Sequence, residues 1–527
     1  MKRISLSILL LVFYLFGKGQ FFDENSIKLS QILYFIDHDY VDTVNINNLV
    51  EETIVKMLEE LDPHSAYISK DEVKEMNEPL EGSFEGIGIM FNILNDTIIV
   101  VSPIAGGPSE KVGLMAGDRI VKINGENVGG IGITNTEVQK KLKGPKGTQV
   151  EVGIKRRKVS ELLDFTITRD IIPINSIDAY YKVVDKIGYI KINRFSNTTR
   201  GEFYNALSTL EDQGVEDYVL DLSNNGGGFL QVAFMLAEEF LSKDKLIVYT
   251  EGIHSPRQEY KSSGNGLLKD SKLVIIIDEG SASASEILSG AIQDWDRGVI
   301  IGRRSFGKGL VQKQYELNDG SMIRLTIAKY YTPTGRLIQK PYNDGIDAYE
   351  KDLINRYMRG ESFNKDSIHF PDSLKYKTLV KGRTVYGGGG IMPDIFIPLD
   401  TTLYTDYYRN MIRKGLLNRF VLTYLDTERN TLLKKYKTFN DYNIKFEISD
   451  DILNDLIKFA EDNNVDYIEK DFIISKDLIK QVLKARIAGD VWTYNEFYQI
   501  INKNSKELLK AVEILQNWEE YQQKIMN

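Results

Sequence analysis

The sequence predicts a multidomain protein that combines the α+β and α/β classes, and three observations lead to this prediction. The chain has 527 residues, which is too long for one domain. Residues 273–312 alternate short apolar, β-branched runs with a helical pattern, as expected for a βαβ unit in a buried parallel sheet. Residues 21–80 and 401–527 instead repeat apolar positions at helical spacing. We therefore expect N-terminal helices, a central α/β core and a C-terminal helical appendage.

The composition narrows the classes of function. The chain has no cysteine, which rules out disulfides, thiol catalysis, thiolate metal sites and a lipoprotein anchor. Its four histidines lie scattered without the spacing of metal ligands, so we expect no metal site and no cofactor. A net charge of −9 and the lack of a basic stripe argue against nucleic acid as a partner.

The first residues have the pattern of a secretory signal. A basic start precedes an apolar run over residues 4–16, and small residues follow. The run is shorter than the ~20 residues of a membrane span. We expect residues 1–20 to direct export to the periplasm, and an uncleaved anchor in the inner membrane, facing the periplasm, is left open as the alternative. The helical region at residues 21–80 that follows is broken at residues 61–67 (LDPHSAY).

The central βαβ unit brings a hydroxyl and an amine to one edge of the predicted sheet. After the first strand, residues 273–277, three serines stand at alternate positions where a helix begins, and we interpret Ser281 as a turn residue and Ser285 as a helix cap. Lys308 follows the second strand, residues 299–301. Catalytic groups gather beyond the carboxyl ends of parallel strands, so the lysine is expected within reach of the serine turn. A neutral lysine can activate a serine if burial lowers its pKa.

Two motifs in this unit carry a family resemblance. GSASASEI at residues 280–287 and FGKG at residues 306–309, together with Gln312, resemble the C-terminal processing peptidases, also called tail-specific proteases, which use a serine–lysine dyad. The combination is specific, whereas either motif alone is weak. The resemblance implies that Ser283 is the nucleophile, that Lys308 is the general base and that Gln312 orients the lysine.

A glycine run extends the resemblance to a second loop. The predicted strand at residues 218–222 ends in SNNGGG, and three glycines after a strand expose N–H groups that suit an oxyanion. The run resembles the family segment that supplies one oxyanion donor, which implies the N–H groups of Gly227 and Ala284 as the two donors. Ser223 stands where the family usually has arginine, so the ordering of this loop is in question.

Residues 81–169 resemble a PDZ domain. The run AGDRIVKING at residues 116–125 is the most specific part, and its Asn-Gly pair predicts a hairpin. PDZ domains add a peptide strand to a sheet edge, and the resemblance implies that a loop made of Gly86, Ile87, Gly88 and Ile89 holds the terminal carboxylate of the peptide. A tight turn in a PDZ domain with a purely structural role is the alternative.

The remaining regions complete the expected organisation. The resemblance covers residues 60–400 and implies an α/β peptidase core with a mixed sheet at residues 170–400. Within this core, residues 344–381 are charged and lack periodicity, so we expect an irregular excursion. Residues 401–527 carry no motif, and we expect a helical domain that serves dimerisation or substrate gating.

The sequence thus predicts an exported serine endopeptidase that recognises accessible protein C-termini and cleaves nearby. Its expected partners are protein or peptide substrates, with a homodimer left open. The alternative is a non-catalytic PDZ scaffold that binds C-terminal peptides. A third hypothesis is a nucleotide enzyme, because residues 302–308 fit G-x-x-x-x-G-K. Gly309 replaces the required serine or threonine there, so the hypothesis is ranked far below the dyad.

Overall fold

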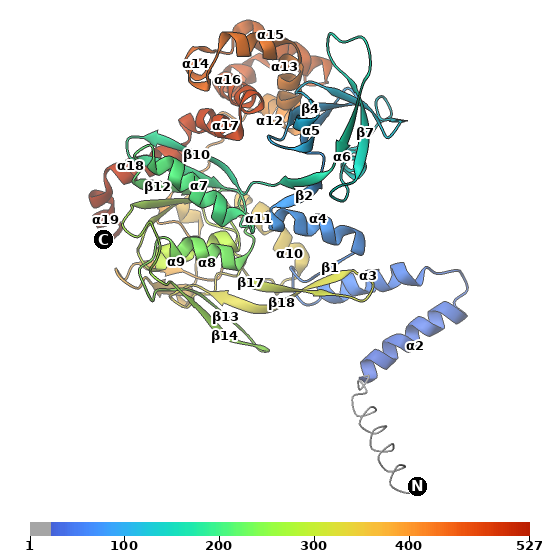
Figure 1. Cartoon of the computed structure of the whole chain (residues 1–527). Coiled ribbons are helices and arrows are strands. Elements are labelled where there is room, and N and C mark those ends of the chain that lie inside the picture. Colours follow the sequence, from blue (N-terminus) through green and yellow to red (C-terminus); the bar gives the residue numbers. More distant parts are fainter. Residues whose placement is uncertain (1–22, 527) are drawn as a thin grey trace, which may run out of the picture. The chain divides into compact units, whose positions relative to one another are not determined.

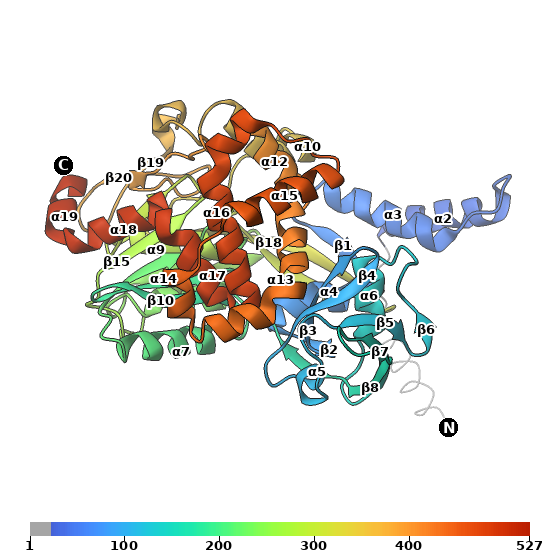
Figure 2. The same ribbon diagram turned by 90° about the horizontal axis from the view of Figure 1, so that it is seen from above.

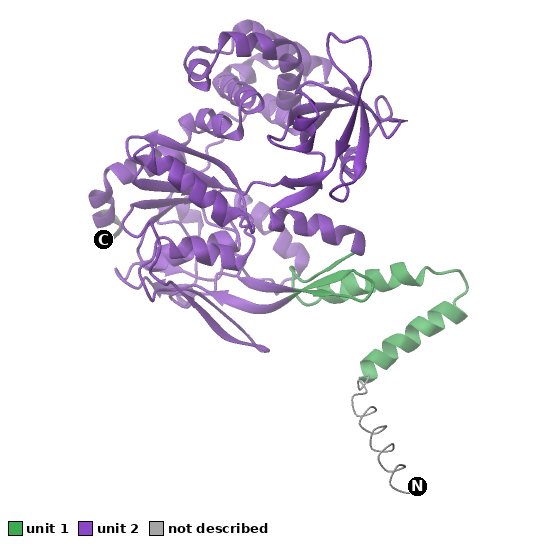
Figure 3. Ribbon diagram, viewed as in Figure 1, with its two compact units in different colours: residues 1–69, 314–325 green, residues 70–313, 326–527 purple. Residues whose placement is uncertain are grey.

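The computed structural model describes residues 23–526, so the predicted signal or anchor at residues 1–20 lies outside the described residues. The chain divides into two compact units, shown in two colours in Figure 3. The first unit comprises residues 1–69 and 314–325, and the second comprises residues 70–313 and 326–527. Across the described part of the chain, no helix combines the length and the apolar character needed to cross a membrane.

Residues 23–69, the described N-terminal part of the first unit, contain two helices and a short strand (Figure 1). These elements are α2 (Glu24–Asp39), α3 (Ile46–Glu59) and β1 (Ala66–Ile68). The Asn45 side chain caps α3 by accepting a hydrogen bond from a main-chain N–H of its first turn. Before β1, the Asp62 carboxylate accepts hydrogen bonds from the N–H groups of His64 and Ser65 and so shapes the predicted turn. β1 pairs antiparallel with residues 322–324.

An antiparallel sheet with two short helices forms the predicted PDZ domain at the start of the second unit. The strand order is β3-β4-β5-β7-β8, with β6 on β5, while β2 and β9 pair separately. The elements are α4 (Lys70–Glu81), β2 (Ser83–Gly86), β3 (Ile89–Leu94), β4 (Thr97–Pro103), α5 (Pro108–Lys111), β5 (Arg119–Ile123), β6 (Glu126–Asn127), α6 (Asn135–Leu142), β7 (Gln149–Lys155), β8 (Leu163–Thr168) and β9 (Asp170–Pro173). Ile98, Ile120 and Ile154 are fully buried on neighbouring strands and form the centre of this core.

The predicted mixed sheet is confirmed in the α/β core. Its order is β10-β11-β12-β15-β16-β21, in which β10 is antiparallel to β11 and the other neighbours are parallel. The elements are β10 (Ile177–Val184), β11 (Ile187–Ile192), α7 (Thr199–Glu211), β12 (Asp217–Asp221), α8 (Leu230–Glu238), β15 (Leu273–Ile277), α9 (Ala284–Asp294), β16 (Val299–Gly302) and β21 (Ile395–Phe396). All five residues of β15 are buried, because both faces of this central strand are covered.

The strands that directly follow α8 and the FGKG motif belong to a second sheet. Its members are β13 (Leu246–Gly252), β14 (Ser255–Lys261), β17 (Leu310–Glu316) and β18 (Met322–Tyr331), together with β1. Because β17 begins directly after the FGKG motif, it fixes the direction in which the chain leaves Lys308.

The prediction of an irregular excursion at residues 344–381 is wrong in part. The segment holds α10 (Ile346–Glu350), α11 (Asp352–Met358), two short 3₁₀ helices (Lys365–Ser367 and Asp372–Leu374) and β19 (Lys375–Lys377), which pairs with β20 (Thr384–Tyr386). Charged groups rather than an apolar stripe hold α11: the Lys340 ammonium lies 3.1 Å from the Asp352 carboxylate, and Arg356 donates to the carbonyl oxygens of Ser305 and Phe306. Apolar periodicity therefore cannot reveal this helix.

The C-terminal residues form helices in two groups. The elements are α12 (Asp406–Arg413), α13 (Leu416–Lys435), α14 (Phe439–Lys445), α15 (Asp450–Asp462), α16 (Glu469–Val491), α17 (Tyr494–Ile501), a 3₁₀ turn (Asn502–Asn504), α18 (Lys506–Gln516) and α19 (Trp518–Met526). α12 to α16 share a hydrophobic core of their own. α18 instead packs on the α/β sheet, where Leu508, Ile514 and Leu515 bury the β15 residues Val274 and Ile276. Figure 2 shows this second group of helices beside the core.

Candidate active site

The predicted nucleophile stands at a strained turn between β15 and α9. The Ser281 hydroxyl donates to the Leu222 carbonyl at 2.8 Å, which confirms Ser281 as a turn residue. Ser283 has φ 54°, a left-handed conformation that costs a residue with a side chain on the order of 1–3 kcal/mol. The prediction for Ser285 is wrong: this residue lies inside α9 and donates to the Asn225 carbonyl instead of capping the helix. The hydroxyls of Ser281 and Ser285 thus fix the turn to the loop that follows β12, and Ser283 is the residue of the turn with the strained backbone.

The lysine loop approaches its neighbours so closely that two glycines are required. Gly307 has φ 93°, and a Cβ there would lie 3.0 Å from the Gly390 nitrogen. A Cβ on Gly309 would lie 2.9 Å from the Gln339 nitrogen. Side chains at these two positions would clash with the neighbouring backbone, and Lys308 between them is partly buried.

A buried carboxylate joins the serine turn to the lysine loop. Glu286 is fully buried in the first turn of α9. Its Oε2 accepts hydrogen bonds from the main-chain N–H groups of Ser283 and Lys308, both at 2.8 Å, so these two nitrogens lie within twice that distance of each other. Its Oε1 accepts from the Gly307 N–H at 2.7 Å and the Ser305 hydroxyl at 2.5 Å. One side chain thereby fixes the backbone of both predicted catalytic residues.

Burial and hydrogen bonding have opposite effects on the pKa of Glu286. Burial raises the pKa of its carboxyl to about 7, although the four hydrogen bonds oppose that rise. The same bonds occupy the N–H groups of Gly307 and Lys308, which are therefore not directed toward a phosphate. This observation counts against the nucleotide-binding hypothesis for residues 302–308.

Tyr330 makes a second bridge between the same two residues. Its buried hydroxyl donates to the Ser283 carbonyl at 3.0 Å and also lies against the Lys308 carbonyl. Burial raises the pKa of this phenol well above its usual value, so the hydroxyl keeps its proton. Neither bridging residue is expected from the sequence. Glu286 lies within the GSASASEI motif, where only the serines and Ala284 have expected roles, and Tyr330 lies in β18, outside the two motifs.

The predicted oxyanion donors lie side by side. A Cβ on Gly227 would meet Ser283 Cβ at 2.8 Å and the Ala284 nitrogen at 3.0 Å, so the glycine run packs directly against the nucleophile. Ala284 is the first residue of α9, where an N–H has no partner within the helix. The Gly227 N–H, however, donates to Asn225 Oδ1 at 2.9 Å. The site as described therefore has one of its two predicted donors engaged by the chain itself.

The loop that carries Gly227 is ordered without the arginine of the family pattern. The Ser223 hydroxyl donates to the Asp221 carboxylate at 2.6 Å, and the same carboxylate pairs with Lys191 at 3.0 Å. Lys191 also donates to the Ser223 carbonyl at 2.6 Å. A lysine on the neighbouring strand β11 thus reaches this part of the loop.

Gln312 lies beside a large cavity. Its side-chain amide donates to the Thr326 hydroxyl at 3.3 Å. A cavity of about 1070 Å³ is lined by Gln312, by Phe229 and Leu230 after the glycine run, and by Ile327 on β18. This volume is ample for side chains of an extended peptide, and the wall combines apolar residues with polar and charged ones such as Arg200 and Arg257.

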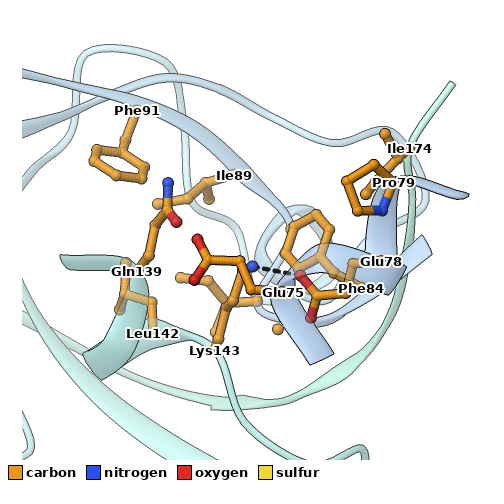
Figure 4. Close-up of a pocket in the computed structure, with 13 residues that line it drawn as sticks. Glu75, Glu78, Pro79, Phe84, Ile89, Phe91, Gln139, Leu142, Lys143 and Ile174 are labelled. Atoms are coloured by element: carbon orange, nitrogen blue, oxygen red, sulfur yellow. Dashed lines mark hydrogen bonds and ion pairs between the residues drawn. The ribbon is translucent and has the colours of Figure 1, made fainter. Parts of the chain in front are cut away.

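The predicted peptide loop lines a separate cavity of about 330 Å³ (Figure 4). Gly86, Ile87, Gly88 and Ile89 all contribute to its wall, together with aromatic rings from β2 and β3. Helix α4 forms the opposite wall, which is not expected from the sequence. In Figure 4 Glu78 of α4 points toward Lys143, and the two side chains form an ion pair at 2.5 Å.

Comparisons with known proteins agree with this architecture. A model of peptidase family S41 matches residues 186–348, and a PDZ domain model matches residues 99–156. A family of unknown function, DUF8443, matches residues 407–493, which contain α13 to α16. The helical C-terminal part therefore has counterparts elsewhere, but its match carries no assigned role.

Several relatives are proteases. The chain is 35% identical over 345 residues to a probable CtpA-like serine protease of Staphylococcus aureus (strain MRSA252), a match that covers 64% of this chain and 68% of that protein. It is 35% identical over 327 residues to the carboxy-terminal processing protease CtpA of Bacillus subtilis (strain 168), covering 60% and 67%. Among solved structures, a photosystem II D1 C-terminal processing protease is 28% identical, with a TM-score of 0.33, and covers 59% of this chain and 90% of that one.

Proposed function

Because this chain belongs to peptidase family S41 and is a serine-type peptidase related to the C-terminal processing proteases, we propose that Ser283 is its nucleophile and Lys308 its general base. One observation carries the proposal. Glu286 binds the N–H groups of both residues, and Tyr330 lies against the carbonyl oxygens of both. Ser283 and Lys308 are far apart in sequence. These contacts hold the main-chain N–H groups of the two residues close together, and likewise their carbonyl groups.

The reaction follows from these roles. The neutral Lys308 amine takes the proton from the Ser283 hydroxyl as its oxygen attacks the carbonyl carbon of the scissile bond. The resulting ammonium then gives a proton to the leaving amine, which departs and leaves an acyl-enzyme. Water, deprotonated by Lys308, attacks the ester and releases the new carboxyl terminus. Gln312, which follows Lys308 on β17, is the residue we assign to orient the amine.

The developing negative charge is stabilised by main-chain donors. The N–H groups of Gly227 and Ala284 are the two donors in the proposal, and their adjacency supports it. The Gly227 N–H has to leave Asn225 Oδ1 before it can serve. The oxyanion site is thus completed during substrate binding.

The substrates we propose are protein chains with accessible C-termini. The loop Gly86–Ile89 lines a cavity of the PDZ domain, and a peptide strand would enter along β3. A solved PDZ domain of a carboxy-terminal protease from Vibrio cholerae, 34% identical to this chain over 17% of its length, is in complex with a peptide (TM-score 0.16). Export to the periplasm, with residues 1–20 as signal or anchor, completes the proposal.

Two substitutions test the dyad. In Ser283→Ala and Lys308→Ala, casein turnover should fall at least about 1000-fold, because a catalytic unit loses its function when one member is removed. Lys329→Ala removes an exposed lysine of β18 and should keep wild-type turnover. Thermal melting of each variant checks the fold. Turnover near wild type in either dyad variant would refute the proposal, and intact peptide binding without turnover in the wild type would favour the scaffold.

A further inference from the structure

A second large cavity lies at the other end of α9 from Ser283. It has a volume of about 1010 Å³ and is bounded by Gln293 of α9, by the β19–β20 hairpin and by residues of α18 and α19. Figure 2 shows β19, β20, α18 and α19 on one side of the α/β core. α9 has 11 residues, so it separates this cavity from Ser283 by about 16 Å. The cavity is therefore no part of the proposed active site.

Positive charge dominates the wall of this cavity. Six lysine and arginine side chains line it: Lys365, Lys375, Lys377, Lys381, Arg383 and Lys510. The chain as a whole is acidic, with 75 aspartates and glutamates against 66 lysines and arginines, so a cluster of this sign runs against the average. Such a cluster in a hollow surface concentrates positive potential.

The acidic residue among the described lining groups cannot offset this charge. Asp394 is nearly fully buried, and its Oδ1 accepts hydrogen bonds from Gln293 and Arg383 while its Oδ2 accepts from the Ile300 N–H. The charge of this carboxylate is thus balanced by groups in the cavity wall. The charge of Arg383 is balanced too, because Arg383 pairs with Asp296 at 2.6 Å as well as with Asp394.

Three of the lysines that line the cavity have no carboxylate partner among the described residues to balance their charge. Within the described part of the chain, Lys365, Lys377 and Lys381 form no ion pair, whereas Lys375 pairs with Asp372 and Lys510 pairs with Glu513 at 3.0 Å. The Lys377 ammonium donates to the Thr384 hydroxyl at 2.9 Å, and the Lys381 ammonium to Gln522 Oε1 at 3.1 Å. Both partners are neutral, so they orient the ammonium groups without cancelling their charge.

Burial lowers the pKa of Lys381, and the positive charge of Arg383 lowers it further, while nearby carboxylates oppose both effects. Asp296, which favours the charged form of Lys381, has a larger effect than Arg383. An anion that entered would place negative charge beside an ammonium that burial has partly removed from water, which favours its binding.

We propose that this cavity binds a phosphate-rich anion. Lysines act as mobile point charges and suit phosphate, whereas a planar carboxylate is better matched by the fork of an arginine, and the Arg383 fork is already occupied. Several lysines from separate segments fit a ligand with several phosphate groups better than one with a single charge. The source of the phosphates is either a soluble polyphosphate or clustered headgroups of an anionic lipid surface.

Calorimetric titration of the full chain with tripolyphosphate tests the proposal. The variant Lys365→Gln/Lys377→Gln/Lys381→Gln should lose at least about tenfold in affinity, because it removes three charges from one cavity. The matched control Lys434→Gln/Lys437→Gln/Lys470→Gln removes three exposed lysines outside the cavity and should bind within about twofold of wild type. Casein turnover and thermal melting of both variants show that each is folded.

Flotation with vesicles of phosphatidylglycerol distinguishes the two sources. Binding of tripolyphosphate alone assigns a soluble ligand, and binding of vesicles that the cavity variant alone abolishes assigns lipid headgroups. The proposal is overturned if the wild type binds neither probe. It is equally overturned if both triple variants lose affinity to the same extent, since binding would then follow net charge and not this cavity.

Discussion

At the scale of single residues, the geometry of the site depends on side chains that have no part in the chemistry. Ser283 and Lys308 supply the hydroxyl and the amine, but Glu286 positions the peptide units of both. Four donors converge on its carboxylate, two on each oxygen. Arg356 adds a further restraint, because it donates to the Ser305 carbonyl just before the lysine loop.

Glu286→Gln is expected to reduce kcat by about 100-fold with little change in KM. The amide replaces one acceptor oxygen by a donor, which faces an N–H donor and displaces one of the two loops, and small displacements of a catalytic group have effects of this size. Steady-state kinetics on a peptide substrate measures the two constants. A rise in KM at unchanged kcat would instead place Glu286 in substrate binding.

Glu286 also predicts a dependence of stability on pH. Its pKa is raised to about 7 in the folded chain from 4.5, so the folded chain keeps this proton over a range in which the unfolded chain has lost it. The contribution to stability is full below pH 4.5, declines as the pH rises, and is lost above pH 7. The total loss is about 3 kcal/mol at most. Urea unfolding from pH 5 to 8 should show this decline in the wild type and lack it in Glu286→Gln.

Gly227→Ala should abolish turnover and destabilise the chain by about 2–3 kcal/mol. Its φ is 101°, and the added Cβ would lie 2.8 Å from both the Ala282 carbonyl oxygen and Ser283 Cβ. Gly226→Ala is the matched control, because a Cβ there meets no atom within 4 Å. Equal activity of the two variants would contradict the close packing of the glycine run on the nucleophile.

At the scale of elements, helix α4 belongs to the peptide groove even though it precedes the PDZ strands. Glu78 pairs with Lys143 in the wall of the cavity that the loop of residues 86–89 also lines, which is where the proposed function places a peptide carboxylate. The Lys143 ammonium also lies 5.1 Å from the centre of the Phe84 ring. The Glu78 carboxylate thus holds the lysine that an incoming carboxylate would attract.

Glu78→Gln should therefore bind C-terminal peptides about threefold to tenfold more tightly, since an ion pair of this kind is worth about 1 kcal/mol. Fluorescence polarisation with a free-acid peptide measures the gain, and the amidated peptide should show none. Glu81→Gln changes an exposed residue of the same helix and serves as the control. Weaker binding of the free acid by Glu78→Gln would rule out competition.

The elements that could be predicted are those whose signal is local. β15 follows from a continuous apolar run, and the serine turn follows from its motif. α11 could not be predicted, because it is held by ion pairs and by Arg356 instead of an apolar stripe. The wall that α4 adds to the groove depends on a contact between Glu78 and Lys143, which no local pattern encodes.

At the scale of the whole molecule, the C-terminal helices are not one appendage. α12 to α16 enclose their own core, whereas α18 covers a face of the α/β sheet. The role in dimerisation or gating expected for residues 401–527 remains a prediction. It has to be tested without removing α18, because its loss would uncover Val274 and Ile276 at the centre of the sheet.

Leu515→Ala should destabilise the peptidase core by about 2–5 kcal/mol, the cost of a cavity at a fully packed leucine. Leu509→Ala changes an exposed leucine of the same helix and should cost less than about 1 kcal/mol. Urea unfolding followed by loss of casein turnover measures both. Equal midpoints would show that α18 does not stabilise the core.

The hydrogen bond from Gly227 to the Asn225 side chain has a consequence for substrate binding. Under the proposed function, the Asn225 side-chain carbonyl oxygen holds the N–H that a substrate oxygen would need, and the buried Asn225 side chain is itself held by its bond to the Ile192 carbonyl. In that proposal, substrate binding and completion of the oxyanion site are one step.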